Sequence, residues 1–210
     1  CWVERRRFGA AVGGCAAEGD AGDFAVLQRG RRGGRVQWSL SGQHNQLNAL
    51  AASAAAEHLG VAPAQAAAAL GEFQNVKRRL EVRGTVPLQG GEVTVYDDFA
   101  HHPTAIRTTV DGLRRQLDNA GKREQRILAL FEPRSNTMKL GTMKAQLPWS
   151  LEQADLAFCH SGGLGWDAVG AMAPMGSRAQ VADTIDGVLA QVVAAARPGD
   201  HVLCMSNGGF

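Results

Sequence analysis

The chain is short of cysteine, has a single tyrosine and carries no strong excess of charge over its 210 residues. Its 22 basic and 20 acidic residues leave a formal net charge of +2, which does not favour a nucleic-acid-binding protein or a membrane-surface domain. No apolar run approaches the roughly 18–20 residues of a membrane span. No basic segment followed by an apolar one suggests a signal peptide. We therefore expect no nucleic-acid and no membrane partner.

The four cysteines, Cys1, Cys15, Cys159 and Cys204, form no C-x-x-C pair, so a zinc site of that kind is not expected. Four scattered cysteines in a chain of this length do not make a disulfide scaffold. Cys159 and Cys204 lie inside apolar runs, where buried reduced thiols are the usual case. A reducing, cytoplasmic location is the expectation.

The chain also lacks an initial Met and any G-x-x-x-x-G-K-[ST] segment, the usual phosphate-binding loop of ATP-using enzymes. It begins at Cys1 and stops at Phe210, directly after an apolar run and a glycine pair. We therefore expect a piece of a longer protein.

Residues 1–40 are rich in glycine and arginine and alternate in short stretches typical of antiparallel strands joined by glycine turns. The run 29–35 contains four arginines but no aromatic residue, so a solvated hairpin turn is favoured over an RNA-binding tail. Two helices are predicted next, over residues 44–59 and 63–73.

From about residue 85 strands and helices alternate. Strands are predicted at 93–96, 127–131, 156–159 and 202–205, and helices at 103–118, 139–152 and 183–196. Such alternation predicts an α/β domain with a mainly parallel sheet covered on both faces. Ligands of such sheets meet the loops at the carboxyl ends of the strands, here 97–103, 132–139, 160–166 and 206–208.

The loop after the first of these strands, Asp97-Asp98-Phe99-Ala100-His101-His102-Pro103, holds two carboxylates and two imidazoles before a helix. A helix N-terminus attracts phosphate, and a carboxylate there can bond a ribose. The alternatives are that Asp97 or His102 merely caps the helix, or that the loop holds a metal ion.

Two further loops suit a substrate with carboxylates. Residues 132–139 place Arg134 after a core strand, where its guanidinium can bind a carboxylate through two parallel hydrogen bonds. Glycines after Ser206-Asn207 permit a close approach by a ligand or by another backbone. The alternatives are an Arg134 that pairs with Glu132 or is solvated, and a plain β-turn at 206–209. The glycine-rich stretch 162–166 matches no phosphate-binding motif.

Near the start of the helix at 44–59, Asn45 and Asn48 are three residues apart, so both amides can face one side. An amide offers a donor and an acceptor, which suits the edge of an adenine ring. The alternative is helix capping.

These segments together resemble the Mur ligases, which join amino acids or peptides to UDP-N-acetylmuramate in bacterial wall synthesis and use ATP. Gly42-Gln43-His44-Asn45 with Asn48-Ala49-Leu50 looks like the family's adenine-side helix. Arg78-Arg79-Leu80-Glu81 looks like the end of its central ATPase domain, and Asp97 to Thr104 like the start of its C-terminal domain.

The resemblance implies residues 1–81 as the C-terminal part of an α/β ATP-binding domain and 82–210 as a Rossmann-like peptide-binding domain. It implies ATP and Mg²⁺ as cofactors, with the magnesium ligands in an earlier part of the ligase and none in this chain. Nothing in the sequence indicates the oligomeric state.

Two segments narrow the resemblance to the wall-recycling branch of the family. They are 132–141 and 198–210, and they are similar to ligases that join the tripeptide L-alanyl-γ-D-glutamyl-meso-diaminopimelate to UDP-N-acetylmuramate. The alternatives are the alanine-adding branch and a non-catalytic module that binds a nucleotide or a peptide.

By family position, Asn45 and Asn48 are assigned to adenine, Arg79 to phosphate, Asp98 to ribose and His101 to the phosphate or substrate side. For the tripeptide, loop position rather than a family motif selects five residues: Arg134, Asn136, Lys139, Ser206 and Asn207.

Overall fold

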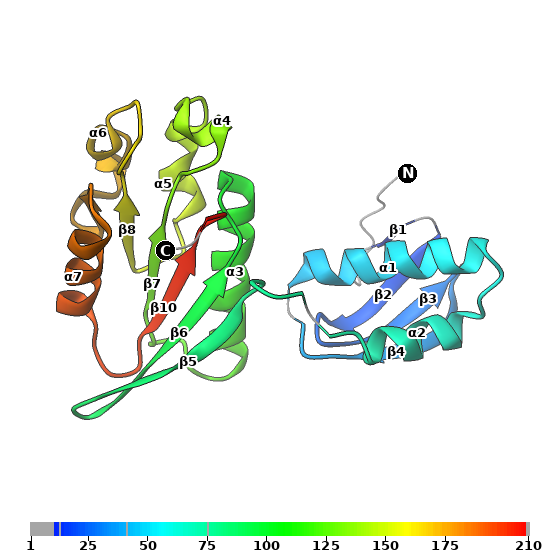
Figure 1. Cartoon of the computed structure of the whole chain (residues 1–210). Coiled ribbons are helices and arrows are strands. Elements are labelled where there is room, and N and C mark those ends of the chain that lie inside the picture. Colours follow the sequence, from blue (N-terminus) through cyan, green and yellow to red (C-terminus); the bar gives the residue numbers. More distant parts are fainter. Residues whose placement is uncertain (1–10, 13, 41, 75, 209–210) are drawn as a thin grey trace. The chain divides into compact units, whose positions relative to one another are not determined.

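The computed structural model describes residues 11–12, 14–40, 42–74 and 76–208, in two compact units, Cys1–Asn75 and Val76–Phe210 (Figure 1). The domain boundary suggested by the sequence, after residue 81, lies slightly further along the chain. Cys1, the Gly209 of the predicted turn and Phe210 lie outside the described residues.

The first unit is an antiparallel sheet with two helices. Its strand order is β1-β2-β3-β4, and the elements are β1 (Ala11–Val12), β2 (Cys15–Asp20), β3 (Asp23–Gln28), β4 (Arg31–Gln37), α1 (Gln43–His58) and α2 (Pro63–Gly71). The short antiparallel strands expected in 1–40 are confirmed within the described part of that segment. Of the arginine-rich run 29–35, only Arg29 and Gly30 form the turn, both with positive φ, and the rest is β4.

The core of this unit lies between the sheet and the helices, where Phe24, Val26 and Val36 meet Leu50 of α1 and Ala67 of α2. A Cβ on Gly34 would come within 2.5 Å of the Ala67 methyl, so α2 lies against β4 closely enough to require glycine there. The buried Ala67 of α2 therefore serves close packing.

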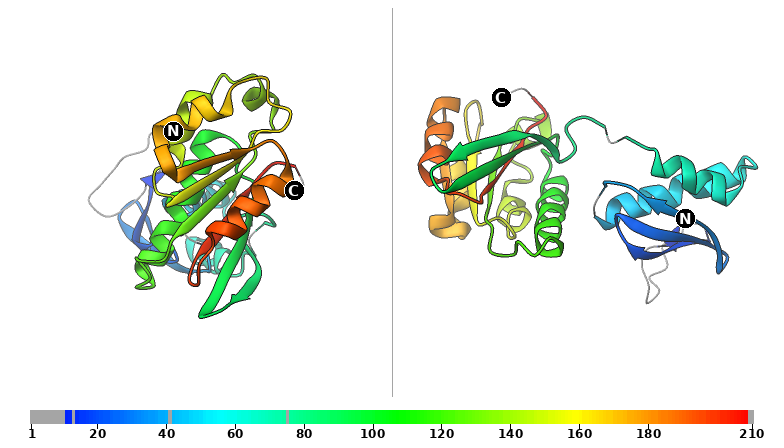
Figure 2. Two further views of the ribbon diagram at one scale, coloured as in Figure 1. Left: turned by 90° about the vertical axis from the view of Figure 1, so that its left-hand side faces the viewer. Right: turned by 90° about the horizontal axis from the view of Figure 1, so that it is seen from below.

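The second unit is a six-stranded sheet with the order β5-β6-β10-β7-β8-β9. Only β5 is antiparallel to its neighbour, and the other pairings are parallel, as the alternation predicted. The strands are β5 (Glu81–Leu88), β6 (Gly91–Asp98), β7 (Ile127–Phe131), β8 (Leu156–His160), β9 (Ala179–Ala182) and β10 (His201–Met205). The β5–β6 hairpin extends past the other strands (Figure 2).

Helices cover both faces of this sheet (Figure 1). On β7, Ile127, Ala129 and Phe131 face the cluster around α3, while Leu128 and Leu130 face the cluster around α7. The continuous apolar run of β7 reflects this burial on two sides. The helical elements are α3 (Pro103–Asn119), α4 (Asn136–Lys139), η1 (Lys144–Gln146), α5 (Leu147–Ser150), α6 (Ala168–Met172), η2 (Ala173–Arg178) and α7 (Ile185–Ala195).

The predicted continuous helix over 139–152 is wrong. The chain there forms α4, η1 and α5, separated by Gly141, whose φ of 72° lies in the left-handed region. A Cβ on Gly141 would come within 2.9 Å of the Trp166 ring, so close packing also requires glycine at this position. Lys139 therefore ends a short helix instead of beginning a long one.

Polar side chains are buried at the amino ends of the central strands. His201 lies between Tyr96 and Gln125, with its Nδ1 3.0 Å from the tyrosine oxygen and its Nε2 2.8 Å from the Gln125 Oε1. A neutral ring that donates from Nε2 and accepts the tyrosine proton at Nδ1 satisfies both bonds. Beside it, Asp200 is 3% exposed and accepts two hydrogen bonds from Arg126.

Three described cysteines are free thiols. Cys15 is buried in the first unit, and burial is the larger of two effects that raise its pKa. Burial raises the pKa of Cys159 to about 12. Burial, with the nearby Asp97 carboxylate, raises that of Cys204 to about 11. No helix within the described ranges is long and apolar enough to span a membrane.

We predict that the second unit loses stability as the pH falls below about 6.5, the ordinary pKa of histidine. Burial lowers the pKa of His201 in the folded chain, with Lys122 and Arg114 acting in the same direction and Asp200 opposing. As the pH is lowered, the unfolded chain therefore takes up the proton before the folded chain does. The free energy of unfolding then decreases with decreasing pH until the folded His201 is protonated as well. Urea unfolding midpoints between pH 7.5 and pH 5, followed through signals from the strands of this unit, measure the slope of stability against pH.

His201→Gln should flatten that slope. The same change at His58, an exposed histidine of α1, is the control and should leave it unchanged. An identical slope in His201→Gln and wild type would show that another group causes it.

Candidate functional site

The carboxyl ends of four strands are aligned in the second unit. Met205 of β10 pairs with Asp98 of β6 and with Phe131 of β7, and Phe131 pairs with Cys159 of β8. The residues that follow, including Phe99, Glu132 and Ser206, are therefore brought to one edge of the sheet. This is the edge that the rule for parallel sheets predicts as the ligand side.

Asp98, predicted to bind a ribose, is buried at this edge and 3% exposed. Its Oδ2 accepts from the backbone N–H of Leu80 at 2.7 Å, and its Oδ1 accepts from that of Ala100 at 2.8 Å and from the Thr109 hydroxyl at 3.2 Å. Burial raises the Asp98 pKa, and the N–H donors act against that rise. Asp98 thus ties the segment before β5 to the loop after β6.

Asp97 and His102 have structural partners of their own. Asp97 forms an ion pair with Arg78 at 3.2 Å. His102 is the N-cap of α3, and its Nδ1 accepts from the backbone N–H of Thr104 at 3.4 Å. Of the two caps considered from the sequence, His102 is the one that the structure has.

Arg79 and His101 both lie against the ring of Phe99. The Phe99 ring is 37% exposed, with the Arg79 guanidinium carbon 5.7 Å from its centroid and the His101 ring edge-on at 5.3 Å. The His101 Nδ1 is 2.9 Å from the Phe99 carbonyl oxygen, so a protonated Nδ1 donates to it. The structure thus brings together two predicted nucleotide-binding residues of this unit.

The segment before β5 is anchored to the same edge through Arg78. Its Nη2 donates to the Ser206 carbonyl at 2.7 Å, and its own carbonyl accepts from the backbone N–H of Phe99 at 2.9 Å. Arg78 and Leu80 have φ of 59° and 50°, which is unfavourable for side chains with a Cβ. The surrounding hydrogen bonds hold this backbone in place.

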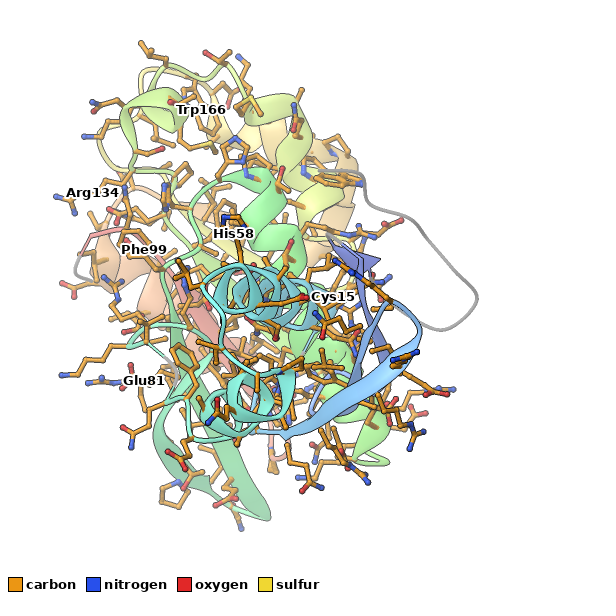
Figure 3. The ribbon with its side chains drawn as sticks, turned by 90° about the vertical axis from the view of Figure 1, so that its right-hand side faces the viewer. Cys15, His58, Glu81, Phe99, Arg134 and Trp166 are labelled. Carbon is orange, nitrogen blue, oxygen red and sulfur yellow. The ribbon has the colours of Figure 1, made fainter. Side chains whose placement is uncertain are left out.

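An open pocket of about 410 Å³ lies beyond the ends of β7 and β10. Four of the five residues predicted to bind the tripeptide line it with Ser135 and Gly208, namely Arg134, Asn136, Lys139 and Asn207. Ser135 caps α4 by accepting from the backbone N–H of Met138, which fixes Asn136 and Lys139 on that short helix. Arg134, labelled in Figure 3, is 51% exposed. Two cations and two amides thus share one pocket.

The fifth residue, Ser206, is 1% exposed and does not line the pocket. Its hydroxyl donates to the Oε2 of Glu132 at 2.8 Å and accepts from the backbone N–H of Gly208 at 2.9 Å. The other oxygen of Glu132 is 3.3 Å from the His160 Nδ1 and 3.4 Å from the Arg134 Nη1. Glu132 and His160 were not among the predicted residues, although both stand at the ends of apolar strands.

Asn45 and Asn48 lie in the other unit, in the first turns of α1, where Asn45 is half-buried and Asn48 is exposed. The N-cap of α1 is Gly42, with no side-chain cap, so neither asparagine caps the helix. The buried Gln46 between them donates to the Gly19 carbonyl at 3.2 Å. It anchors the helix start to the sheet of this unit.

Two other features considered from the sequence are a metal site and the glycine-rich stretch 162–166. Within the described ranges, no group of three or more His, Cys, Asp or Glu side chains could hold a metal ion. In the glycine-rich stretch 162–166, a Cβ on Gly162 would come within 2.6 Å of the Asp183 carbonyl oxygen and 2.7 Å of the His160 Nε2. Gly162 therefore serves packing.

A protein-family model described as "Mur ligase, glutamate ligase domain" matches residues 78–208. The chain belongs to the Mur ligase family. The resemblance carried by its sequence motifs is confirmed, and so is the expected α/β fold with a mainly parallel sheet.

Two curated relatives of this Mur ligase chain carry the same name. It is 45% identical, over its whole length, to the "UDP-N-acetylmuramate--L-alanyl-gamma-D-glutamyl-meso-2,6-diaminoheptandioate ligase" of Escherichia coli K12. Over 91% of its length it is also 45% identical to the Haemophilus influenzae protein of the same name. A solved murein peptide ligase from Psychrobacter arcticus is 37% identical, with a TM-score of 0.69 over 94% of this chain and 42% of that one. The chain spans 45% and 41% of the two curated relatives' lengths.

We predict that Asp98→Ala destabilises the second unit of this Mur ligase chain more than Asp97→Ala does. Removing the Asp98 carboxylate leaves the N–H groups of Leu80 and Ala100 without their acceptor, at about 1–3 kcal/mol for each buried donor. Asp97 forms a partly exposed ion pair, worth about 0–1 kcal/mol. Urea unfolding of the two variants measures the difference. Equal losses would mean that Asp98 does not fix the segment before β5.

Proposed function

We propose that this chain is part of an ATP-dependent ligase that joins L-alanyl-γ-D-glutamyl-meso-diaminopimelate to UDP-N-acetylmuramate, in the cytoplasm, during peptidoglycan recycling. The observation that carries the proposal is the pocket at the ends of β7 and β10, where Arg134, Lys139, Asn136 and Asn207 meet. The whole-length identity to ligases named for this reaction supports it. One relative named UDP-N-acetylmuramate–L-alanine ligase, from Synechococcus, is 40% identical over 54% of the chain.

In the proposed reaction, the carboxylate of UDP-N-acetylmuramate takes a phosphoryl group from ATP. The free amine of the tripeptide attacks the resulting acyl phosphate, and the tetrahedral intermediate collapses to the amide and phosphate, with ADP left from the first step. An amine held in line with the acyl carbon gains the rate advantage of an intramolecular reaction. The task of the pocket is therefore to fix the far end of the tripeptide. The described residues offer no ligand cluster that fits magnesium.

The chemistry of the pocket suits a peptide with several carboxylates. The Arg134 guanidinium can bind one carboxylate through two parallel hydrogen bonds, and Lys139 offers a second, less directional cation. The Oδ1 of Asn207 is buried and has no hydrogen-bond partner among the described residues, so it is an acceptor for an N–H or ammonium group of the peptide. Asn136 supplies both a donor and an acceptor.

The proposed nucleotide contacts are assigned residue by residue from family position. Asn45 and Asn48 contact adenine, Arg79 a phosphate, Asp98 the ribose, and His101 the phosphate or substrate side. Family position supports these roles, as does the placement of Arg79 and His101 around the exposed Phe99 ring. Asp98 would contact a ribose while keeping its two backbone donors.

We predict that Arg134→Lys, made in the full-length ligase, raises the KM for the tripeptide at least about tenfold, because lysine cannot reproduce a charged two-point hydrogen bond. The ATP KM and the melting temperature should stay near wild type, since Arg134 is half exposed. Steady-state kinetics with each substrate varied in turn provide the measurement.

The matched control is Arg115→Lys on the exposed side of α3, which should change neither KM. An unchanged tripeptide KM in Arg134→Lys would contradict the peptide role, and a lower melting temperature with all substrates affected alike would make Arg134 structural. Free L-alanine used in preference to the tripeptide by the wild-type ligase would place the protein in the alanine-adding branch.

We also predict that the 210-residue chain alone releases no phosphate from ATP, with or without tripeptide. It contains no G-x-x-x-x-G-K-[ST] segment to hold the transferring phosphoryl group, and that contact supplies much of the transition-state stabilisation. A phosphate-release assay on the purified chain tests this. Tripeptide-dependent release would show that the chain carries phosphoryl-transfer groups of its own.

A further inference from the structure

The buried carboxylate of Glu132 connects three of the loops at the ligand edge. It is 6% exposed and directly follows β7. Its Oε2 accepts from Ser206 after β10, and its Oε1 faces His160 at the end of β8 and Arg134 of the pocket. One carboxylate thus meets a hydroxyl, an imidazole and a guanidinium from separate loops.

Arg134 is restrained by a second contact, with Gly208. A Cβ built on Gly208 would lie 3.1 Å from both the Cδ and the Nη1 of Arg134 and 3.4 Å from its Cζ. The guanidinium therefore lies directly on the Gly208 backbone, in space that any larger residue would need. Gly208 is itself held by the Ser206 hydroxyl, which Glu132 orients.

We infer that Glu132 is a positioning residue for substrate recognition: its carboxylate holds the Arg134 guanidinium and the Ser206–Gly208 turn in the arrangement that binds the peptide carboxylate. The inference rests on the proposed function of the pocket. Glu132 is 6% exposed and does not line the pocket, so it acts through Arg134 and not on the peptide itself.

The physical reason is preorganisation. A free arginine side chain has many rotamers, and fixing them on binding lowers affinity. Glu132 engages the Nη1 side of the guanidinium before any ligand arrives, so the remaining N–H groups are oriented in advance. Of the two cations that line the pocket, Arg134 pairs with the Glu132 carboxylate behind it, whereas Lys139 has no ion pair among the described residues.

Glu132→Gln tests this in the full-length ligase, since glutamine keeps the shape and removes the charge. The variant should raise the tripeptide KM about tenfold, the size expected for one charge-assisted hydrogen bond. The kcat and the ATP KM should stay near wild type. Glu124→Gln, an exposed glutamate before the amino end of β7, is the matched control and should change nothing.

A double-mutant cycle separates positioning from a general structural role. In an Arg134→Met background, Glu132→Gln should raise the tripeptide KM by less than about twofold, because the residue through which it acts is gone. Should Glu132→Gln fold poorly, Gly208→Ala takes its place, since its methyl would lie 3.1 Å from the Arg134 Nη1 and require the same guanidinium to shift. Two results would overturn the inference. One is an equal rise in the tripeptide KM on Glu132→Gln in both backgrounds. The other is no rise on Glu132→Gln although Arg134→Met alone raises the tripeptide KM.

The Nε–H resonance of Arg134, assigned by its absence in Arg134→Met, gives a readout that needs no substrate. A held guanidinium should exchange its Nε proton with water measurably more slowly in wild type than in Glu132→Gln. Equal exchange rates would overturn the inference. If the pocket does not bind the tripeptide, Arg134→Met leaves the tripeptide KM unchanged while the exchange difference persists, so failure of the proposed function is recognised separately.

Discussion

The pairing of β10 with β6 on one side and β7 on the other is the constraint on which the second unit depends. β10 is the last of the described strands, yet it lies third in the sheet, and without it the β5–β6 hairpin would have no partner in that sheet. The register of these two parallel pairings also places Asp98, Met205 and Phe131 in one row. Because this register aligns the ends of the strands, the loops that carry Arg134 and Asn207 meet at one pocket.

Both ends of β10 carry buried polar groups, and they differ in character. At the amino end, Asp200 is fully engaged by Arg126, and His201 by Tyr96 and Gln125, so those side chains satisfy one another. At the carboxyl end, Glu132 and Ser206 are buried, but the groups around them, Arg134 and Asn207, open into the pocket. Buried pairs satisfied on all sides serve the fold, whereas a buried group with one partner at the surface can orient that partner for a ligand.

Much of this could be predicted from the sequence, because apolar periodicity and strand–helix alternation report burial directly. The parallel sheet, the ligand edge and the arginine of the pocket follow from those signals. The break in 139–152 has local signals in Gly141 and Pro148, but the contact between Gly141 and the distant Trp166 cannot be predicted from the sequence. Loop position assigns Ser206 to the peptide, but its hydroxyl faces inward. The sequence names Glu132 only as an alternative partner of Arg134, because nothing local shows that this carboxylate is buried. The orientation of Ser206 and the burial of Glu132 both depend on residues that are distant in the sequence.

The rate at which its thiols are modified can report how often each unit opens. Alkylating reagents attack the thiolate, and Cys159 and Cys204, with pKa values of about 12 and 11, contain almost none of it in the folded chain at neutral pH. Cys15, buried in the first unit, is likewise protected. Modification of the two buried thiols, Cys15 and Cys159, must therefore wait for the unit of each to open, whereas Cys204 is partly exposed. Labelling followed site by site by mass spectrometry would time the opening of a six-stranded parallel sheet and of a small antiparallel one within a single molecule.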